Sequence, residues 1–447
     1  MTLNLRKFIE ACRPTKTLDM ENIEDRGYYI DFAGVRGDRV INKLKRTITH
    51  LYPDKPTCQL FTGHIGCGKS TELSWLQNEL KQERFRVVYF QATDDLDVED
   101  VDITDILLAI AHQVTESLVK EKINLPTRGL KAFLKEVWEF LNTPIEITEI
   151  ETSLPNGIAK ITATIKDSQH LRSRLRQRLE PETMKLLNII NEEIFKVATE
   201  QLKEHYKGLV IIVDNLDRIQ NKTTAVSSNP LPEYLFVDRG EQLSQISCHL
   251  VYTLPLSLIF SNQREVLKSR MGKGASPMVL PMIPVQYRDG REHTEGMALL
   301  RQMVLARAFP DVTSNERLNL VTEVFDSMKT LDRLCSVTGG HVRNLLGMLY
   351  SCLQEDDPPI SHRILEKVIR IERDALALAI DQDEWDLLFQ VVKQQTVKGD
   401  KEFQTLLQSL FVFEYQDEQG KWFGLNPLLF ETEKYKLWKQ QNQDKRI

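Results

Sequence analysis

The sequence predicts an α/β protein, in which a parallel sheet flanked by helices is followed by a helical lid and a C-terminal winged-helix domain. Three observations support this class. A glycine-rich stretch joins an apolar strand to a helix with an apolar stripe, and two later apolar runs end at Asp214 and Thr253. The last third of the chain has helical periodicity and then a hairpin pattern. We therefore expect four parts: 1–45, an N-terminal arm; 46–285, the α/β core with an insertion at about 120–205; 286–375, the lid; and 376–447, the winged helix.

Composition excludes some classes of protein and leaves others open. The chain has 447 residues, 41% of them hydrophobic, which is enough for ordinary buried cores. Because no apolar run reaches membrane-span length and no signal-peptide pattern opens the chain, we expect a cytoplasmic protein. The six cysteines lack metal-ligand spacing and indicate reduced thiols. A net charge of −6 argues against a globally basic nucleic-acid binder but permits a local basic patch.

The first element is a phosphate-binding motif. Residues 63–70 match G-x-x-x-x-G-K-[ST], in which glycines let backbone N–H groups surround phosphate oxygens at a helix N-terminus. Lys69 is expected to contact the β- and γ-phosphates, and Ser70 to hold Mg²⁺. The candidate nucleotide-binding residues of this stretch are Gly63, His64, Ile65, Gly66, Cys67, Gly68, Lys69, Ser70 and Thr71.

The flanking segments fit the motif. Residues 58–62 form a short apolar run, Leu73, Leu76 and Leu80 make one helical stripe, and 86–91 form a second apolar run. This strand–loop–helix–strand order is what a P-loop NTPase core requires. The sequence therefore predicts binding of ATP or GTP, with ATP and Mg²⁺ as the expected cofactors.

The second half of the predicted site is the apolar run 209–214, which ends in Asp214. A carboxylate at the carboxyl end of a buried parallel strand can hold the Mg²⁺ water shell opposite Ser70, which is the Walker B role. The next residue, Asn215, is an amide and cannot accept a proton, whereas Asp217 is a carboxylate that could activate water. We therefore expect slow hydrolysis. At the end of run 249–253, Thr253 is either a γ-phosphate sensor or a threonine that caps its strand.

Four motifs in order (63–70, 213–218, 253–255 and 338–343) resemble the ORC/STAND/KAP side of the AAA+ P-loop ATPases. The D-x-L-D-R form at 214–218 is similar to KAP-type ATPases. The resemblance implies that Arg343 follows a Gly-Gly turn as a sensor-2 arginine, reaching the γ-phosphate from the lid; a surface arginine after a turn is the alternative. It also implies a pre-loop segment over the adenine, with Phe32 or Arg36 near the base, and a trans-acting arginine among Arg218, Arg239, Arg264 and Arg270.

We expect the insertion at about 120–205 to contact a partner. It is preceded by an acidic run from Asp94 to Asp105, which suits the start of a helix at Ile106. Two isoleucine-rich stretches, 145–150 and 158–165, flank Leu-Pro-Asn-Gly and indicate a hairpin. A helical arm to about Tyr206 then carries arginines that could meet a phosphate backbone or an acidic surface, although a solvated arm is the simpler interpretation. These are Arg172, Arg174, Arg176 and Arg178.

The C-terminal segment fits a winged helix, with helices at 384–393 and 402–410 and strands at 411–415 and 421–425. Winged helices bind DNA through the second helix and the wing, but this second helix has little positive charge beyond Lys401. A protein-contact or lid-supporting role is therefore favoured over DNA binding.

Two functions compete. The first is an ATP-dependent molecular switch of the STAND/AAA+ kind that hydrolyses ATP slowly through Lys69, Asp214, Asp217 and Arg343. It would control self-association or a partner effector protein, in a role that the resemblance connects with bacterial defence. The second is a DNA-associated AAA+ ATPase, such as an initiator, loader or transposition regulator, whose winged helix holds duplex DNA. A nucleotide-binding scaffold without hydrolysis is a third interpretation, based on Asn215.

Overall fold

The computed structural model describes residues 3–37, 39–123, 125, 128–141, 154–224 and 227–443. The chain divides into two compact units, each built from separate stretches of sequence. The first unit contains residues 1–40, 63–74 and 279–447, and the second contains residues 41–62 and 75–278. The glycine-rich loop at 63–70 thus belongs to the same unit as the lid and the C-terminal segment.

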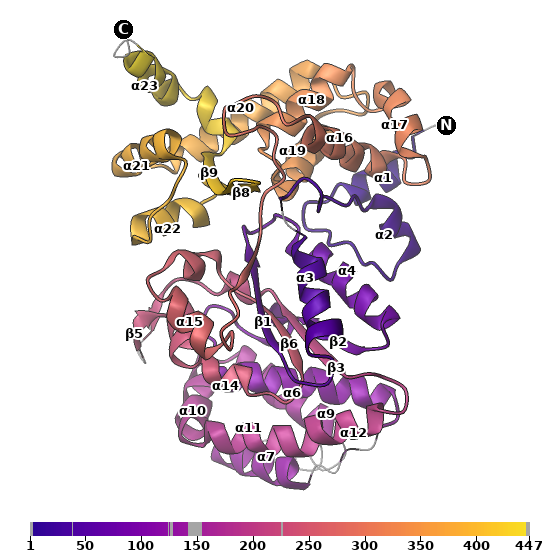
Figure 1. Ribbon diagram of the computed structural model, residues 1–447, viewed down its shortest axis with the longest axis vertical. Coiled ribbons are helices and arrows are strands. Elements are labelled where there is room, and N and C mark those ends of the chain that lie inside the picture. The colour runs from indigo at the N-terminus through magenta and orange to yellow at the C-terminus, as the bar shows by residue number, and fades with distance from the viewer. Residues whose placement is uncertain are drawn as a thin grey trace. The chain divides into compact units, whose positions relative to one another are not determined.

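The second unit is organised around parallel strands (Figure 1). They are β1 (Cys58–Gly63), β2 (Arg86–Gln91), β3 (Leu209–Asp214) and β6 (His249–Thr253). Their order in the sheet is β2-β3-β6-β1, and the short strand β7 (Met278–Leu280) completes it. Every residue of β3 and β6 is buried, as expected for strands covered on both faces. This confirms the predicted parallel sheet flanked by helices.

Register brings the predicted polar residues to one edge of that sheet. Asp214 pairs with Gln91, and Thr253 pairs with Phe61 of β1, two residues before the glycine-rich loop begins. Because all these strands are parallel, their carboxyl ends meet at this edge. The edge is where ligands bind in open α/β sheets.

Helices of the second unit cover the sheet and build the insertion (Figure 1). The helix before the sheet is α3 (Val40–Arg46), followed by a π-helical turn (Thr47–Leu51). The other elements are α4 (Lys69–Gln82, whose first residues belong to the first unit), α5 (Ala92–Asp95), α6 (Ile103–Lys120), α7 (Arg128–Leu141), α9 (Leu154–Lys166), α10 (Gln169–Leu179), α11 (Thr183–Ile190), α12 (Val197–Leu202), β4 (Thr223–Thr224), β5 (Ser227–Pro230), α13 (Leu231–Glu233), α14 (Gly240–Ser244) and α15 (Arg264–Arg270).

The expected hairpin in the insertion is wrong over 158–165, which lies within α9; its first arm, 145–150, falls outside the described residues. Leu-Pro-Asn-Gly, interpreted as a turn, begins the helix, where proline is tolerated because the first turn leaves N–H groups unpaired. Ile158 and Ile161 are both fully buried, with the i, i+3 spacing of a helix face. The spacing of the apolar residues in this stretch is therefore helical, and its isoleucine-rich composition predicts the wrong secondary structure.

Two arginines of the helical arm are paired with the acidic run that precedes the insertion. Arg172 is ion-paired with Asp97 (2.9 Å) and Asp100 (3.0 Å), and Arg176 with Asp100 (2.5 Å) and Asp105 (3.5 Å). Asp102 and Asp105 also form a capping box at the start of α6. Burial raises the pKa of Asp105 to about 6, although the nearby Arg176 charge opposes this shift. The acidic run and the arginine arm thus neutralise each other.

Arg176→Ala is expected to destabilise the second unit by about 3 kcal/mol, because it leaves the buried carboxylate of Asp105 without its paired cation. Chemical denaturation measures the loss. Arg178→Ala is the matched control, since Arg178 pairs with Glu182 one turn away and with the half-exposed Glu136, and should cost only about 0.5–1 kcal/mol. Equal effects of the two substitutions would contradict the buried network.

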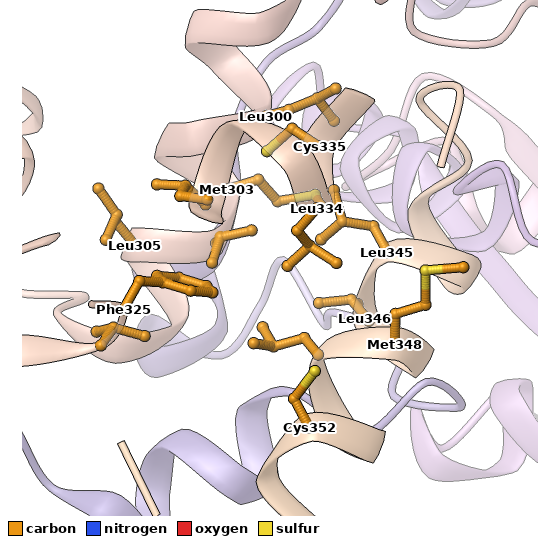
Figure 2. Close-up of a cluster of buried hydrophobic side chains, with 14 of the residues drawn as sticks. Leu300, Met303, Leu305, Phe325, Leu334, Cys335, Leu345, Leu346, Met348 and Cys352 are labelled. Carbon is orange, nitrogen blue, oxygen red and sulfur yellow. The ribbon is translucent and has the colours of Figure 1, made fainter. Parts of the chain in front are cut away.

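The first unit is mainly helical. Its lid helices are α16 (Thr294–Ala308), α17 (Ser314–Asn319), α18 (Met328–Val337), α19 (Val342–Glu355) and α20 (His362–Leu378), and its N-terminal helices are α1 (Leu5–Ala11) and α2 (Ile23–Tyr28). Figure 2 shows their common core, in which Leu300 and Met303 of α16 meet Leu334 of α18 and Leu345 of α19. Phe8 and Phe32 belong to the same cluster. The N-terminal segment is therefore held by the lid's hydrophobic core.

The C-terminal segment has the element order of a winged helix. It contains α21 (Gln382–Gln394), α22 (Lys401–Gln408), the antiparallel strands β8 (Val412–Asp417) and β9 (Gly420–Leu425), and α23 (Glu433–Gln443). At the tip of the hairpin, both carboxylate oxygens of Asp417 accept hydrogen bonds from Arg288, at 2.6 and 2.9 Å. The wing is thus fastened to the segment that precedes the first lid helix, α16. None of the helices in the described part of the chain is long and apolar enough to cross a membrane.

Candidate nucleotide-binding site

The candidate residues divide between the two units. The loop 63–70 and Arg343 belong to the first unit, and Asp214, Asp217 and Thr253 to the second. In the loop, Lys69 is buried, and its Nζ donates to the carbonyl oxygens of Gly63 and His64, at 2.8 Å each. Its ammonium therefore lies inside the loop, at the first residue of α4. A lysine in this position can contact phosphates that bind to the surrounding backbone N–H groups.

Glycine is required at the centre of the loop. Gly66 has a φ of 86°, in the left-handed region that few other residues adopt. A Cβ at this position would lie 2.7 Å from His341 Cε1 and 2.8 Å from Arg343 Cβ. The carbonyl of Gly66 also accepts a hydrogen bond from the backbone N–H of Arg343, at 3.1 Å. The start of α19 therefore lies directly against the loop.

Two histidines connect the loop with the lid and the winged helix. His64 Nε2 accepts a hydrogen bond from the backbone N–H of Glu414 in β8, at 2.9 Å. His341, the N-cap of α19, has its Nε2 2.8 Å from the carbonyl oxygen of Ile65 and accepts from the N–H of Asn344 at Nδ1. Phe413 lies between the rings, edge-on to His64 and stacked on His341. Three consecutive loop residues, His64, Ile65 and Gly66, thus contact the C-terminal elements.

These contacts require neutral rings. His64 Nε2 and His341 Nδ1 each accept from a backbone N–H, so a proton on either nitrogen would break that bond. Burial, with the nearby His341 and Lys69 charges, lowers the pKa of His64 to about 3. Burial also lowers the pKa of His341 to about 4, opposed by its bond to Ile65.

Acid should therefore destabilise the first unit. Unfolded histidine has a pKa near 6.5, so between about pH 6.5 and 4 the unfolded chain binds more protons than the folded chain. Each ring then removes about 1.4 kcal/mol of stability per pH unit as the pH falls. Denaturation at pH 7 and pH 5 measures this slope. His341→Asn, which keeps an N-cap acceptor, should reduce the slope by about one proton, and an unchanged slope would contradict the assignment.

Arg36 and Arg343 flank the loop. Arg36 is buried, and its Nη2 donates to the carbonyl oxygen of Cys67 at 2.9 Å, with the guanidinium beside the Phe32 ring. Arg343 is the second residue of α19, and its side chain lines a cavity of about 520 Å³ between the lid and the winged helix. The structure thus brings Arg343 next to the loop through its backbone. The roles of both arginines in nucleotide binding are proposals.

In the second unit, the end of β3 forms a polar cluster. One carboxylate oxygen of Asp214 accepts from the N–H of Asn215 at 2.7 Å, and the other from the hydroxyl of Tyr89 at 2.9 Å. Asp214 is almost fully buried at the sheet edge. Both oxygens are thereby oriented, which fits a carboxylate that holds Mg²⁺ directly or through water.

Thr253 connects β6 to the turn that carries Asp217. Its hydroxyl accepts from the N–H of Leu216 at 3.0 Å and lies 3.4 Å from the carbonyl oxygen of Val213. Asp217 lies in the 3₁₀ turn Leu216–Arg218 and is largely buried. Any response of Thr253 to phosphate would therefore pass to Asp217 through this turn.

The four candidate trans-acting arginines differ in their surroundings. Arg239 bonds the Tyr234 hydroxyl and Thr183, and Arg270 bonds the carbonyl oxygen of Val237. Arg218, Arg264 and Arg270 are all exposed, but the guanidinium of Arg270 is already bonded within its own unit, so Arg218 and Arg264 are the two considered next. The last two are thus the better candidates for contact with a second molecule.

Comparison with known proteins finds one family model that matches part of the chain. Residues 38–227 match the KAP family P-loop domain, a stretch that contains both the glycine-rich loop and Asp214. This stretch is a P-loop NTPase domain. The match confirms the resemblance to KAP-type ATPases over rather less than half of the chain. No protein with a curated description matches the chain.

Solved structures of ORC and Cdc6 proteins align along most of the chain. The Aeropyrum pernix ORC2 protein in its ADPNP–ADP complexes shares 10% identity and covers 96% of this chain and 95% of its own, with a TM-score of 0.42. The Aeropyrum pernix ORC1 protein in complex with DNA shares 12% identity. The match covers 89% of this chain and 93% of the ORC1 chain, with a TM-score of 0.35. Cdc6p from Pyrobaculum aerophilum shares 12% identity. The match covers 91% of this chain and 95% of the Cdc6p chain, with a TM-score of 0.38.

Proposed function

We propose that this P-loop NTPase is an ATP-dependent molecular switch that hydrolyses ATP slowly and controls self-association or a partner protein. The observation that carries the proposal is the set of contacts from His64, Ile65 and Gly66 to β8 and α19. A loop that closes on phosphates must adjust its backbone, and these contacts transmit any adjustment to the lid and the winged helix. Nucleotide state is thereby coupled to the position of two C-terminal elements.

The residues at the site support the chemistry. Lys69 and the loop backbone would hold the β- and γ-phosphates, Ser70 and Asp214 would hold Mg²⁺, and Asp217 would accept a proton from the attacking water. Bound Mg²⁺ supplies positive charge that neutralises the phosphates. We further propose that Arg343 contacts the γ-phosphate from α19 and that Arg218 or Arg264 acts across an interface between copies.

The winged helix supports a protein-contact role more than DNA binding. The exposed residues of α22 are Lys401, Glu402, Thr405 and Gln408, which offer one positive charge and one negative charge. The wing tip carries Asp417, already bonded to Arg288. DNA binding usually neutralises several phosphates with lysine and arginine, which neither element provides. The arginines of the insertion arm have internal partners as well.

The solution mass of the purified protein tests the switch. We expect the mass to rise with a slowly hydrolysed ATP analogue and Mg²⁺, but not with ADP or without nucleotide. Phe413→Leu should bind the analogue with unchanged affinity but lose the change in mass, because its ring contacts with His64 and His341 are removed. The matched control is Phe389→Leu, a phenylalanine of the same domain that stacks on Trp438 away from the loop. A mass independent of nucleotide, with nucleotide bound, would contradict control of self-association.

A further inference from the structure

The second half of helix α20, from Arg370 to its C-cap Ala379, is largely apolar but has no buried side chain. Its apolar residues are Ile371, Ala375, Leu376, Ala377, Leu378 and Ala379. Leu378 is 88% exposed and Ile371 is 54% exposed. The buried residues of α20 all lie in its first half. Because helices in proteins are stabilised mainly by packing of an apolar face, this end of α20 has an apolar face that the chain itself leaves uncovered.

The cavity of about 520 Å³ in the first unit lies beside this end of the helix. Ala375 and Ala379 line one of its walls, and Gly347 and Met348 of α19 line another. Ala375 is also exposed to solvent. The uncovered face of α20 is thus continuous with the mouth of the cavity. Contiguous apolar surface of this kind is typical of protein contact sites.

Helical spacing gathers the exposed residues into one stripe. Its members are Lys367, Ile371, Asp374, Ala375 and Leu378, which follow one another at intervals of three or four positions along the helix. Residues with this spacing share a helix face. We call this set the α20 stripe. Its centre is apolar, and its middle residue, Ala375, is small.

The charges at the two ends of the α20 stripe are opposite in sign. Lys367 and Arg370 lie on its N-terminal side, whereas Asp381 and Asp383 follow the C-terminus of the helix, and all four are exposed. The negative end of the helix dipole adds to the acidic side. Lys367 is paired with Glu355, but that pair is exposed and such pairs contribute little. The stripe is therefore complementary in charge to a copy of itself that runs in the opposite direction.

We propose that the α20 stripe is a contact between two copies of this chain, in which α20 packs antiparallel to α20 of a second copy. Leu378 of one copy then contacts Ile371 of the other, and the two Ala375 side chains lie near the two-fold axis, where their small size allows close approach. Lys367 faces Asp383 of the other copy. Asp374 also lies near the axis, and its bond to Arg373 at 2.8 Å compensates its charge.

This contact gives the proposed self-association a surface, and in that respect it rests on the proposed function. Analytical ultracentrifugation of the full-length protein, over a concentration series with and without the slowly hydrolysed ATP analogue, tests it. Leu378→Asp places a charge in the apolar centre of the contact and should weaken self-association about tenfold or more. Because Leu378 is so exposed, its substitution should leave the melting temperature of the monomer unchanged. Leu437→Asp is the matched control, an exposed leucine of α23, and should associate as the wild type does.

A charge exchange tests the partner of Lys367. Lys367→Glu should weaken self-association about threefold to tenfold, since the contact would contain two copies of the altered pair. Asp383→Lys in the same chain should restore the wild-type affinity, because the two charges have exchanged places. Equal weakening in the single and the double variant would contradict the antiparallel arrangement.

Cross-linking tests the direction of the two helices. All six natural cysteines are buried, so an introduced thiol on α20 is the accessible one. Ala375→Cys lies near the two-fold axis and should form a disulfide between copies under mild oxidation. Arg363→Cys, at the exposed start of the same helix, should remain monomeric, because the antiparallel arrangement places its two copies far apart. Efficient cross-linking through Arg363→Cys would indicate parallel helices and overturn the inference.

The outcomes distinguish this inference from the switch proposal. A mass that rises with the ATP analogue to the same extent in the wild type and in Leu378→Asp would overturn the α20 contact and leave the switch intact. A dimer that requires Leu378 but forms equally with and without nucleotide would support the contact and contradict nucleotide control of self-association. A wild type that stays monomeric throughout the series would overturn the contact, and a different protein would then be the occupant of the stripe.

Discussion

Lys69→Ala is expected to weaken binding of Mg·ATP by about 100-fold or more, with hydrolysis lost in parallel. The ammonium of Lys69 lies within the loop, bonded to the carbonyl oxygens of Gly63 and His64, so it is already in place when phosphates bind. Charge-assisted bonds to phosphate contribute about 1.5–3 kcal/mol each, and one or two of them account for the expected loss. Titration calorimetry with the slowly hydrolysed analogue measures Kd.

A matched control separates this effect from general charge loss. Lys55→Ala removes an exposed lysine just before β1 and should leave Kd within about twofold, as is usual for exposed charges. Both variants should keep a cooperative unfolding transition. An affinity of Lys69→Ala close to that of the wild type would remove the loop from the nucleotide site, and the switch proposal would fail with it.

Gly340→Ala is expected to destabilise the first unit by about 3 kcal/mol or more. Gly340 has a φ of 76°, and a Cβ there would lie 1.8 Å from the carbonyl oxygen of Ile283. The left-handed conformation alone costs about 1–2 kcal/mol for alanine, and the backbone clash adds to it. Because Gly340 precedes His341, the displacement would also disturb the contacts between α19 and the loop. Denaturant unfolding, followed by circular dichroism, measures the change.

Gly347→Ala provides the comparison within the same helix. Gly347 lies inside α19, and the nearest atom to an added Cβ is Pro14 Cγ at an ordinary contact distance of 3.8 Å. Alanine favours helix by about 0.5–1 kcal/mol over glycine, so this variant should be as stable as the wild type or slightly more stable. Equal stability of the Gly340 and Gly347 variants would contradict the close approach at Ile283.

Local pattern was sufficient to predict the sheet and the polar residues at the carboxyl ends of its strands. The apolar runs at β1, β2, β3 and β6 are short and bounded by turns, so composition and length identified them; β1, β3 and β6 are buried along their whole length, and β2 is buried in part. The hairpin at α9 was wrong because isoleucine-rich stretches favour strands by composition, whereas Ile158 and Ile161 had the spacing of a helix. In α9, the spacing of the buried isoleucines predicts the helix better than the preference of isoleucine for strands does.

The contacts that complete the site were not predictable in the same way. His64 and Glu414 are separated by 350 positions, and nothing local to either residue points to the other. The pairing of Arg172 and Arg176 with the acidic run joins a predicted helix start to an arm for which a solvated surface was the simpler interpretation. Tyr89 and Gln91 did carry a signal, because they are alternate polar residues at the end of an otherwise apolar strand. Their partners became evident only from the parallel register of β2 and β3.

The neighbouring strands β2 and β3 also have a consequence for how the chain folds. They pair along their whole length, although the entire helical insertion lies between Gln91 and Leu209. Closing a loop costs only about 0.6 kcal/mol for each doubling of its length, so the insertion adds little to the equilibrium cost of this pairing. Its effect on rate is larger, since non-local parallel pairs form late. During synthesis, β2 must wait until the ribosome has delivered the insertion and β3, and early folding of the insertion's own helices would shorten that search.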